Sequence, residues 1–286
     1  MSNLYNRNHA VAYTNEDIYR FAPSVFAVNA HESRSDRFKP IATIEILDRL
    51  REEGFEVVSA TQSRTRDSSK RDYTKHMLRL RHVNDLANVT AKDKLTDTHA
   101  EIVLKNANDG SAAYQLHAGA YRTICANGLI AMTDLFDCIK VRHSGSIEKI
   151  AHNVIEGTFT VLEETNKMLG NRNDWAAINM SDEARMAFAE AAHVIRFGDS
   201  EGKVETPIKP SQLLTPRRAF DRATDLWTVY NVVQENAIKG GMRAYDYNKE
   251  RFTSAREVKG IDQDVKLNKA LYKLADYFAQ QVKSAA

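Results

Sequence analysis

The sequence has little of what marks secreted or membrane proteins. Its 286 residues include two cysteines, Cys125 and Cys138, which offer neither a disulfide framework nor a CxxC motif. No apolar run approaches the roughly 20 residues of a membrane helix. The polar start of the chain, MSNLYNRNHAVAYTNED, lacks the apolar stretch of a signal peptide. These absences predict a protein of a reducing cytoplasm that makes no contact with a membrane.

Proline and glycine are scarce as well, with 5 and 12 residues, which argues against long disordered linkers. Hydrophobic residues make up 43% of the chain and charged residues 27%, as is typical of globular proteins. The length suits one large domain or two modest ones with a substantial core.

Sequence motifs of common enzyme classes are missing too. The sequence contains no GxGxxG, no GxxxxGK[ST], no GxSxG and no HExxH, and no Cys/His pair has zinc spacing. We therefore expect no cofactor and no metal, and we assign no catalytic residue. An enzyme is the least favoured alternative; it would need a nonstandard site around His76, His99, His117 and His143.

Hydrophobic periodicity predicts an α+β fold, in which a small antiparallel sheet with a β-β-β-α core precedes a helical C-terminal half. We expect an irregular arm at 1–40 with a short strand at 25–29, an α+β core at 41–145, and a helical region at 146–286 that packs on the core. Within the core we expect a helix at 42–53, strands at 55–65, 76–83 and 98–106, a helix at 111–127 and a strand at 139–143. Further helices are expected from residue 146 onward and at 182–197, 220–238 and 262–283.

The segment 99–130 has the most distinctive local pattern. Asn108-Asp109-Gly110 is a strong turn signal after a predicted strand. Ser111 is placed to cap the N-terminus of a helix that Gly128 would end. The small residues of this segment would let the helix sit close to the sheet.

A net charge of +2 does not predict a polyanionic partner, but the charge is unevenly distributed. Residues 62–82 hold seven Lys or Arg against two Asp. Arg79 and Arg81 would share one face of a strand about 7 Å apart, which matches the spacing of successive phosphates on a single DNA strand. A solvated surface is the alternative explanation of this basic segment.

Aromatic and basic residues alternate in two places, as in proteins that stack bases and pair with phosphates. The first is Tyr73-Thr74-Lys75-His76, and the second lies at 245–252. The predicted nucleic-acid site has phosphate contacts from five cations and base contacts from two rings: Arg64, Arg66, Lys75, Arg79, Arg81, Tyr73 and His76.

Several short motifs occur in the order of a known family. They are Gln62-Ser63-Arg64-Thr65, the segment 74–79, Asn108-Asp109-Gly110-Ser111 continuing to Leu129, and the pair 258–262 and 267–271. Across roughly residues 40–280 the chain resembles the phage- and plasmid-borne family catalogued as domain of unknown function 932. The resemblance implies a mobile element in a bacterial host cell, with a role in DNA metabolism, defence evasion or host takeover.

The expected order of three antiparallel strands and a helix is also similar, at the level of fold, to single-strand annealing proteins of the RecT/Red-beta and Erf groups. This similarity implies a single-stranded DNA-binding or annealing protein of recombination or replication, assembled as a homo-oligomeric ring or filament. The alternative is an interaction protein of a mobile element, for antidefence or host takeover, that binds no DNA.

Overall fold

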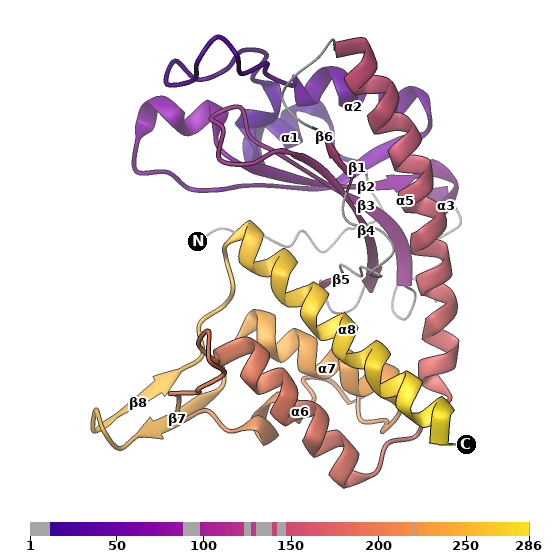
Figure 1. Cartoon of the computed structure of the whole chain (residues 1–286), viewed down its shortest axis with the longest axis vertical. Helices are drawn as coiled ribbons and strands as arrows, with labels where there is room; N and C mark the ends of the chain where they lie inside the picture. Colours follow the sequence, from indigo (N-terminus) through magenta and orange to yellow (C-terminus); the bar gives the residue numbers. More distant parts are fainter. Residues whose placement is uncertain are drawn as a thin grey trace. The chain divides into compact units, whose positions relative to one another are not determined.

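The computed structural model describes residues 12–87, 98–122, 127–129, 139–141, 147–219 and 221–285 (Figure 1). It divides into two units, each with its own internal contacts. Unit 1 comprises Met1–Gly128 and Met132–Lys167, and unit 2 comprises Leu129–Ala131 and Met168–Ala286.

Unit 1 is built on a mainly antiparallel sheet, which confirms the α+β class. Its strands are β1 (Phe55–Gln62), β2 (His76–His82), β3 (Thr98–Asn106), β4 (Tyr114–Arg122), β5 (Asn127–Leu129) and β6 (Ile139–Val141). The order is β1-β2-β3-β4-β5, and β6 pairs with β4. Strand β2 pairs antiparallel with β1 and β3, and β4 pairs antiparallel with β3 and β6.

Helices α1 (Asn15–Phe21) and α2 (Thr43–Glu52) and the 3-10 helix η1 (Pro23–Phe26) lie against one face of this sheet (Figure 1). Leu47 and Leu50 of α2 are fully buried in the same hydrophobic core as Leu78 and Leu104 of the sheet. The same core includes Val154 of α5 (Ile147–Ala176). Two short helices, η2 (Ser68–Tyr73) and α3 (Val83–Ala87), flank β2.

The helix expected at 111–127 is wrong, because this segment forms β4 and β5. Asn108 to Gly110 instead turn the chain into a β3–β4 hairpin, with Gly110 at φ +78° and the Ser111 amide donating to Asp109 Oδ1 at 2.8 Å. Tyr114 and Leu116 are both fully buried. Residues two apart share a face in a strand but point in nearly opposite directions in a helix, so the period of two gives the better account of this burial.

The N-terminal region is more regular than expected. Thr14 and Asp17 form a reciprocal capping box that begins α1. The strand expected at 25–29 is wrong, since Val25 belongs to η1, which Pro23 begins. This proline has no amide proton to donate to a sheet, but it suits the first turn of a helix.

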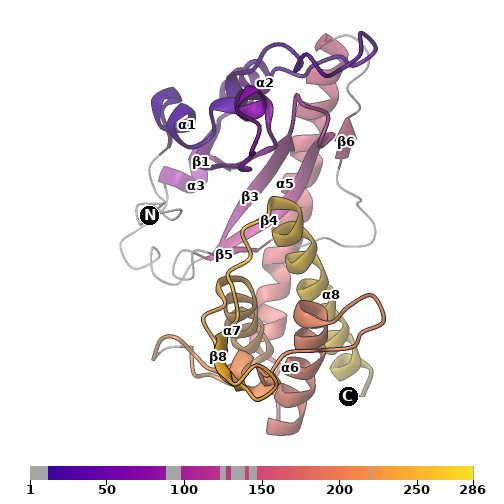
Figure 2. The same cartoon turned by 90° about the vertical axis from the view of Figure 1, so that its left-hand side faces the viewer.

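Unit 2 contains helices, as expected, and one hairpin that was not expected. Its elements after α5 are α6 (Asp182–Phe197), η3 (Pro210–Leu214), α7 (Leu226–Lys239), β7 (Arg243–Asp246), β8 (Arg251–Ser254) and α8 (Ile261–Ala285). Helices α6, α7 and α8 lie side by side (Figure 2). The side chains of Ser181 and Asp225 cap α6 and α7, so α7 begins later than the predicted residue 220. Among the described helices, none has the length and apolarity needed to cross a membrane.

Candidate anion-binding site

Two of the five cations expected to contact phosphates, Arg79 and Arg81, are buried. Arg79 is 6% exposed and Arg81 is 1% exposed. Arg79 Nε lies 2.5 Å from Glu101 Oε2, and Arg81 Nη2 lies 2.6 Å from Glu101 Oε1. Burial opposes ionisation of Glu101, but the two guanidinium groups outweigh it and lower the pKa of this carboxyl. The expectation of an accessible arginine face on β2 is therefore wrong, because β3 supplies a shared counter-ion.

His76 is also buried and cannot stack on a base. Its Nδ1 lies 2.9 Å from Ser24 Oγ, and its Nε2 lies 2.9 Å from Thr43 Oγ1. Burial lowers the pKa of His76 to about 4, so the ring is neutral near pH 7. The histidine joins η1 and α2 to β2, and its expected role in DNA contact is wrong.

Tyr73 and Lys75 are half-buried and support the loop between β1 and β2. The Tyr73 ring packs edge-to-face on His31, with ring centroids 5.4 Å apart. The Tyr73 carbonyl accepts from the amides of Asn108 and Asp109. The Ser63 amide donates to the Lys75 carbonyl at 2.7 Å. The nucleic-acid contacts of Tyr73 and Lys75 stay predictions.

Arg64 and Arg66 are exposed and line a depression of about 450 Å³. Arg20, from α1, and Arg71, from η2, line the same depression and are exposed as well. Among the residues that the structure describes, none of these four guanidinium groups forms an ion pair with a carboxylate. Arg20 was not predicted from the sequence, because it lies more than 40 residues before Arg64, and Arg71 was recognised only as part of a basic run. We call Arg20, Arg64, Arg66 and Arg71 the arginine pocket.

The Gln62 side chain, which lines the arginine pocket, bridges η1 and η2. Its Oε1 accepts from the Ser24 amide at 2.9 Å, and its Nε2 donates to the Arg71 carbonyl at 2.6 Å. Thr74 Oγ1 donates to the Ser63 carbonyl at 3.2 Å. Together these bonds fix both ends of the loop that presents Arg64 and Arg66, so the arginines project from an anchored loop.

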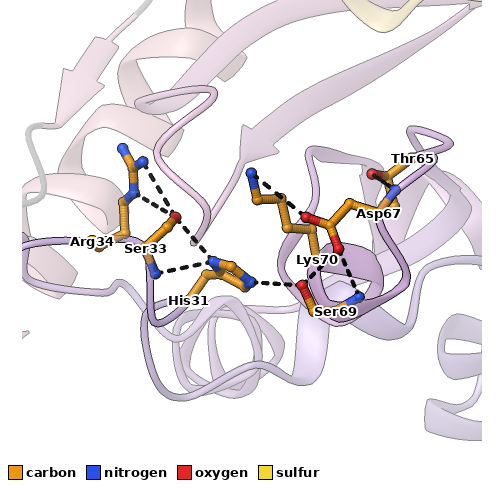
Figure 3. Close-up of polar contacts among 7 residues, drawn as sticks. All are labelled: His31, Ser33, Arg34, Thr65, Asp67, Ser69 and Lys70. Carbon is orange, nitrogen blue, oxygen red and sulfur yellow. Dashed lines mark hydrogen bonds and ion pairs between the residues drawn. The ribbon is translucent and has the colours of Figure 1, made fainter.

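Beside the pocket lies a set of polar contacts that superficially resembles a catalytic triad (Figure 3). His31 Nε2 lies 3.2 Å from Ser69 Oγ, and Ser69 Oγ donates to Asp67 Oδ1 at 2.6 Å. His31 Nδ1 accepts from the Ser33 amide at 3.2 Å, so Nε2 carries the proton and donates to Ser69. A nucleophilic serine would instead donate its proton to the histidine. The contacts therefore anchor η2, and the Ser69 hydrogen bond lowers the pKa of Asp67.

The alternative of a histidine-based metal site has no geometric support in the described part of the chain. No group of three or more His, Cys, Asp and Glu residues that could hold a metal ion occurs there. His143, Cys125 and Cys138 lie outside the described residues. His76 is already bonded to two hydroxyl groups.

Comparisons with known proteins identify relatives but no activity. The family model described as Domain of unknown function (DUF932) matches residues 30–272. Two proteins of Escherichia coli (strain K12), UPF0380 protein YafZ and UPF0380 protein YfjQ, are each 39% identical over 281 residues, which cover 98% of this chain and 96% of the relative. No solved structure matches the chain. The expected fold similarity to single-strand annealing proteins is thus unsupported, and β4 occupies the place of the helix on which it rested.

Proposed function

The chain belongs to the family Domain of unknown function (DUF932), whose description names no activity. We propose that this protein binds single-stranded DNA through phosphate groups at the arginine pocket. The observation that carries this proposal is the convergence of Arg20, Arg64, Arg66 and Arg71 on one depression without acidic partners among the described residues.

The electrostatics of the arginine pocket favour a polyanion. Four exposed guanidinium groups around one depression repel one another, and a bound phosphate relieves this repulsion. Each guanidinium presents donors in a planar fork that matches the oxygens of a phosphate. Ser63, Thr65 and Ser68 add hydroxyl groups to the same lining. The pocket therefore supplies both charge and hydrogen bonds to a phosphate backbone.

The form of the pocket favours a single strand over a duplex. Its volume of about 450 Å³ lies within the range of pockets that enclose small ligands, about 300–1,000 Å³. A flexible strand can bend a phosphate and its neighbouring base into such a depression. Phe21 is among the residues that line it and offers an apolar surface to a base. A duplex keeps its bases stacked inside and is contacted along its grooves instead.

Fluorescence polarisation with a labelled oligothymidylate tests the proposal. We expect the double variant Arg64→Ala/Arg66→Ala to bind more weakly. The fall of log K with log salt should become less steep by about 1.4, since each phosphate contact to a single strand contributes about 0.7 to the steepness. The matched control Arg37→Ala/Arg49→Ala removes two exposed arginines elsewhere in unit 1 and should bind as the wild type does. Absence of binding at low salt, or equal slopes for both double variants, would refute the proposal.

The proposed annealing activity and subunit assembly can be measured with the same reagents. An annealing protein speeds the pairing of complementary strands and needs several subunits, because one subunit grips only a few nucleotides. Mass measurement in solution, with and without oligonucleotide, tests the assembly. Capture of a stoichiometric protein partner without oligonucleotide binding would instead favour an interaction protein of a mobile element.

A further inference from the structure

The β7–β8 hairpin of unit 2 exposes three aromatic rings within eight residues. Tyr247 is 84% exposed, Phe252 is 66% exposed and Tyr245 is 38% exposed. Exposed aromatic clusters of this kind commonly mark interaction sites, because large apolar rings are otherwise removed from water.

The three rings are ordered around Tyr245. Tyr245 and Phe252 are direct cross-strand partners, with centroids 5.3 Å apart and planes at 78°. Tyr247 lies edge-on to Tyr245 at 5.0 Å and 76°. The guanidinium carbon of Arg243 lies 5.7 Å from the centre of the Phe252 ring. The rings therefore contact one another, the Arg243 guanidinium lies over the Phe252 ring, and most of the surface of Tyr247 and Phe252 remains exposed.

Exposed charge on the hairpin is predominantly positive. Arg243 and Arg251 are exposed, and neither forms an ion pair within the described part of the chain. The acidic Asp246 is 6% exposed; it accepts from the amides of Asn248 and Lys249 and pairs with the Lys249 ammonium at 3.1 Å. Glu250, in the turn, is the exposed acidic residue of this segment. Cations beside open rings suit a ligand that is both anionic and aromatic.

We propose that the β7–β8 hairpin is a second, independent contact for single-stranded DNA, in which bases stack on Tyr247 and Phe252 while Arg243 and Arg251 pair with the adjoining phosphates. The proposal takes its ligand class from the proposed function but rests on other residues in the other unit. Only an unpaired strand offers base faces for such stacking, and the contact tolerates any sequence because every base has a flat face.

Stabilisation of the hairpin alone does not explain all three rings. An isolated two-stranded hairpin is marginal in water, and the Tyr245–Phe252 cross-strand pair helps to hold it. Tyr247 lies outside that pair and buries little of its surface, so it adds little to the stability of the hairpin. Its exposed face is the part of the cluster that ligand binding explains best.

The test compares two probes on the whole chain: a labelled oligothymidylate and an abasic oligonucleotide of the same length. Tyr247→Ala should weaken binding of oligothymidylate about tenfold, within the roughly 5- to 150-fold range of one lost stacking contact, and should leave the affinity for the abasic probe and the salt slope unchanged. Phe252→Ala should act similarly. Tyr277→Ala removes a 58% exposed tyrosine of α8 and serves as the matched control.

The outcomes separate the two proposals. Wild-type affinity of Tyr247→Ala for oligothymidylate overturns the hairpin contact and leaves the arginine pocket standing. Equal losses on both probes also overturn it, because the contact would not depend on bases. Loss in the hairpin variants, combined with no effect of Arg64→Ala/Arg66→Ala, supports the hairpin and overturns the pocket. If the wild type binds neither probe, both proposals are overturned.

Discussion

Replacing Glu101 by glutamine should destabilise unit 1 strongly, because Glu101 is the shared counter-ion of two buried arginines. Glu101 is 2% exposed, and its two oxygens each lie within 2.6 Å of a guanidinium nitrogen of Arg79 or Arg81. Glutamine has nearly the same size and leaves no cavity. The substitution therefore removes a charge while packing is preserved.

The expected loss in the free energy of unfolding is about 3–5 kcal/mol, the cost of leaving a buried charge without its partner. A typical domain is stable by only about 5–15 kcal/mol, so the loss is easily measured. The exposed pair Arg51–Asp48, at 3.2 Å with Asp48 60% exposed, gives the contrast. Asp48→Asn should change stability by less than about 1 kcal/mol.

Urea denaturation followed by circular dichroism measures both variants, and hydrogen exchange of the β2 and β3 amides locates the effect in the sheet. If uncompensated charge is the cause, replacing Arg79, Arg81 and Glu101 together by apolar residues should recover much of the loss. A Glu101→Gln variant within about 1 kcal/mol of the wild type would show that this ion-pair cluster contributes little to the stability of the sheet.

Two further perturbations test the buried histidine and the α7 terminus. Because burial lowers the pKa of His76 to about 4, the unfolded chain takes up a proton below pH 6.5 that the folded chain does not. The contribution of His76 to the free energy of unfolding should therefore fall by about 1.4 kcal/mol for each pH unit from pH 6.5 toward 4. His76→Gln should remove this contribution and make the pH dependence of stability correspondingly less steep. An unchanged pH dependence in urea titrations at several pH values would contradict this. At the end of α7, Gly240 has φ +63° and a Cβ there would lie 2.4 Å from the Ala255 carbonyl oxygen, whereas Gly241, at φ +84°, has open space. Gly240→Ala should thus lower the melting temperature more than Gly241→Ala, and equal effects would count against the steric argument.

Sequence periodicity predicted the elements that depend on local signals. The helix at 182–197 coincides with α6, because Ser181 caps it and its apolar residues repeat at helical spacing. The strands at 76–83 and 98–106 correspond closely to β2 and β3. The segment 114–122 was predicted to be part of a helix, because its small apolar residues fit a helical stripe as well as a strand. In the structure this segment is a strand that pairs with β3 along nearly its whole length.

The candidate site was predicted only in part. Arg64 and Arg66 were identified from a local run of charge, and the structure places both at an exposed depression. Arg20 joins them only because α1 and the β1–β2 loop meet in the fold. The aromatic and basic residues at 245–252 were noticed in the sequence, but their arrangement as a hairpin was not.

The sequence by itself determined the class of fold, the positions of most helices and strands, and the basic character of the segment 62–82, since these follow from residue spacing and composition. Only the tertiary structure decided which cations of that segment are accessible. Arg79 and Arg81 lie on the strand, are buried and share Glu101 as a counter-ion, about 20 residues further along the chain, whereas Arg64 and Arg66 lie on the anchored loop and face solvent. The physical reason is that burial and ion pairing depend on which distant residues the sheet brings together, and charge along a sequence carries no record of that pairing.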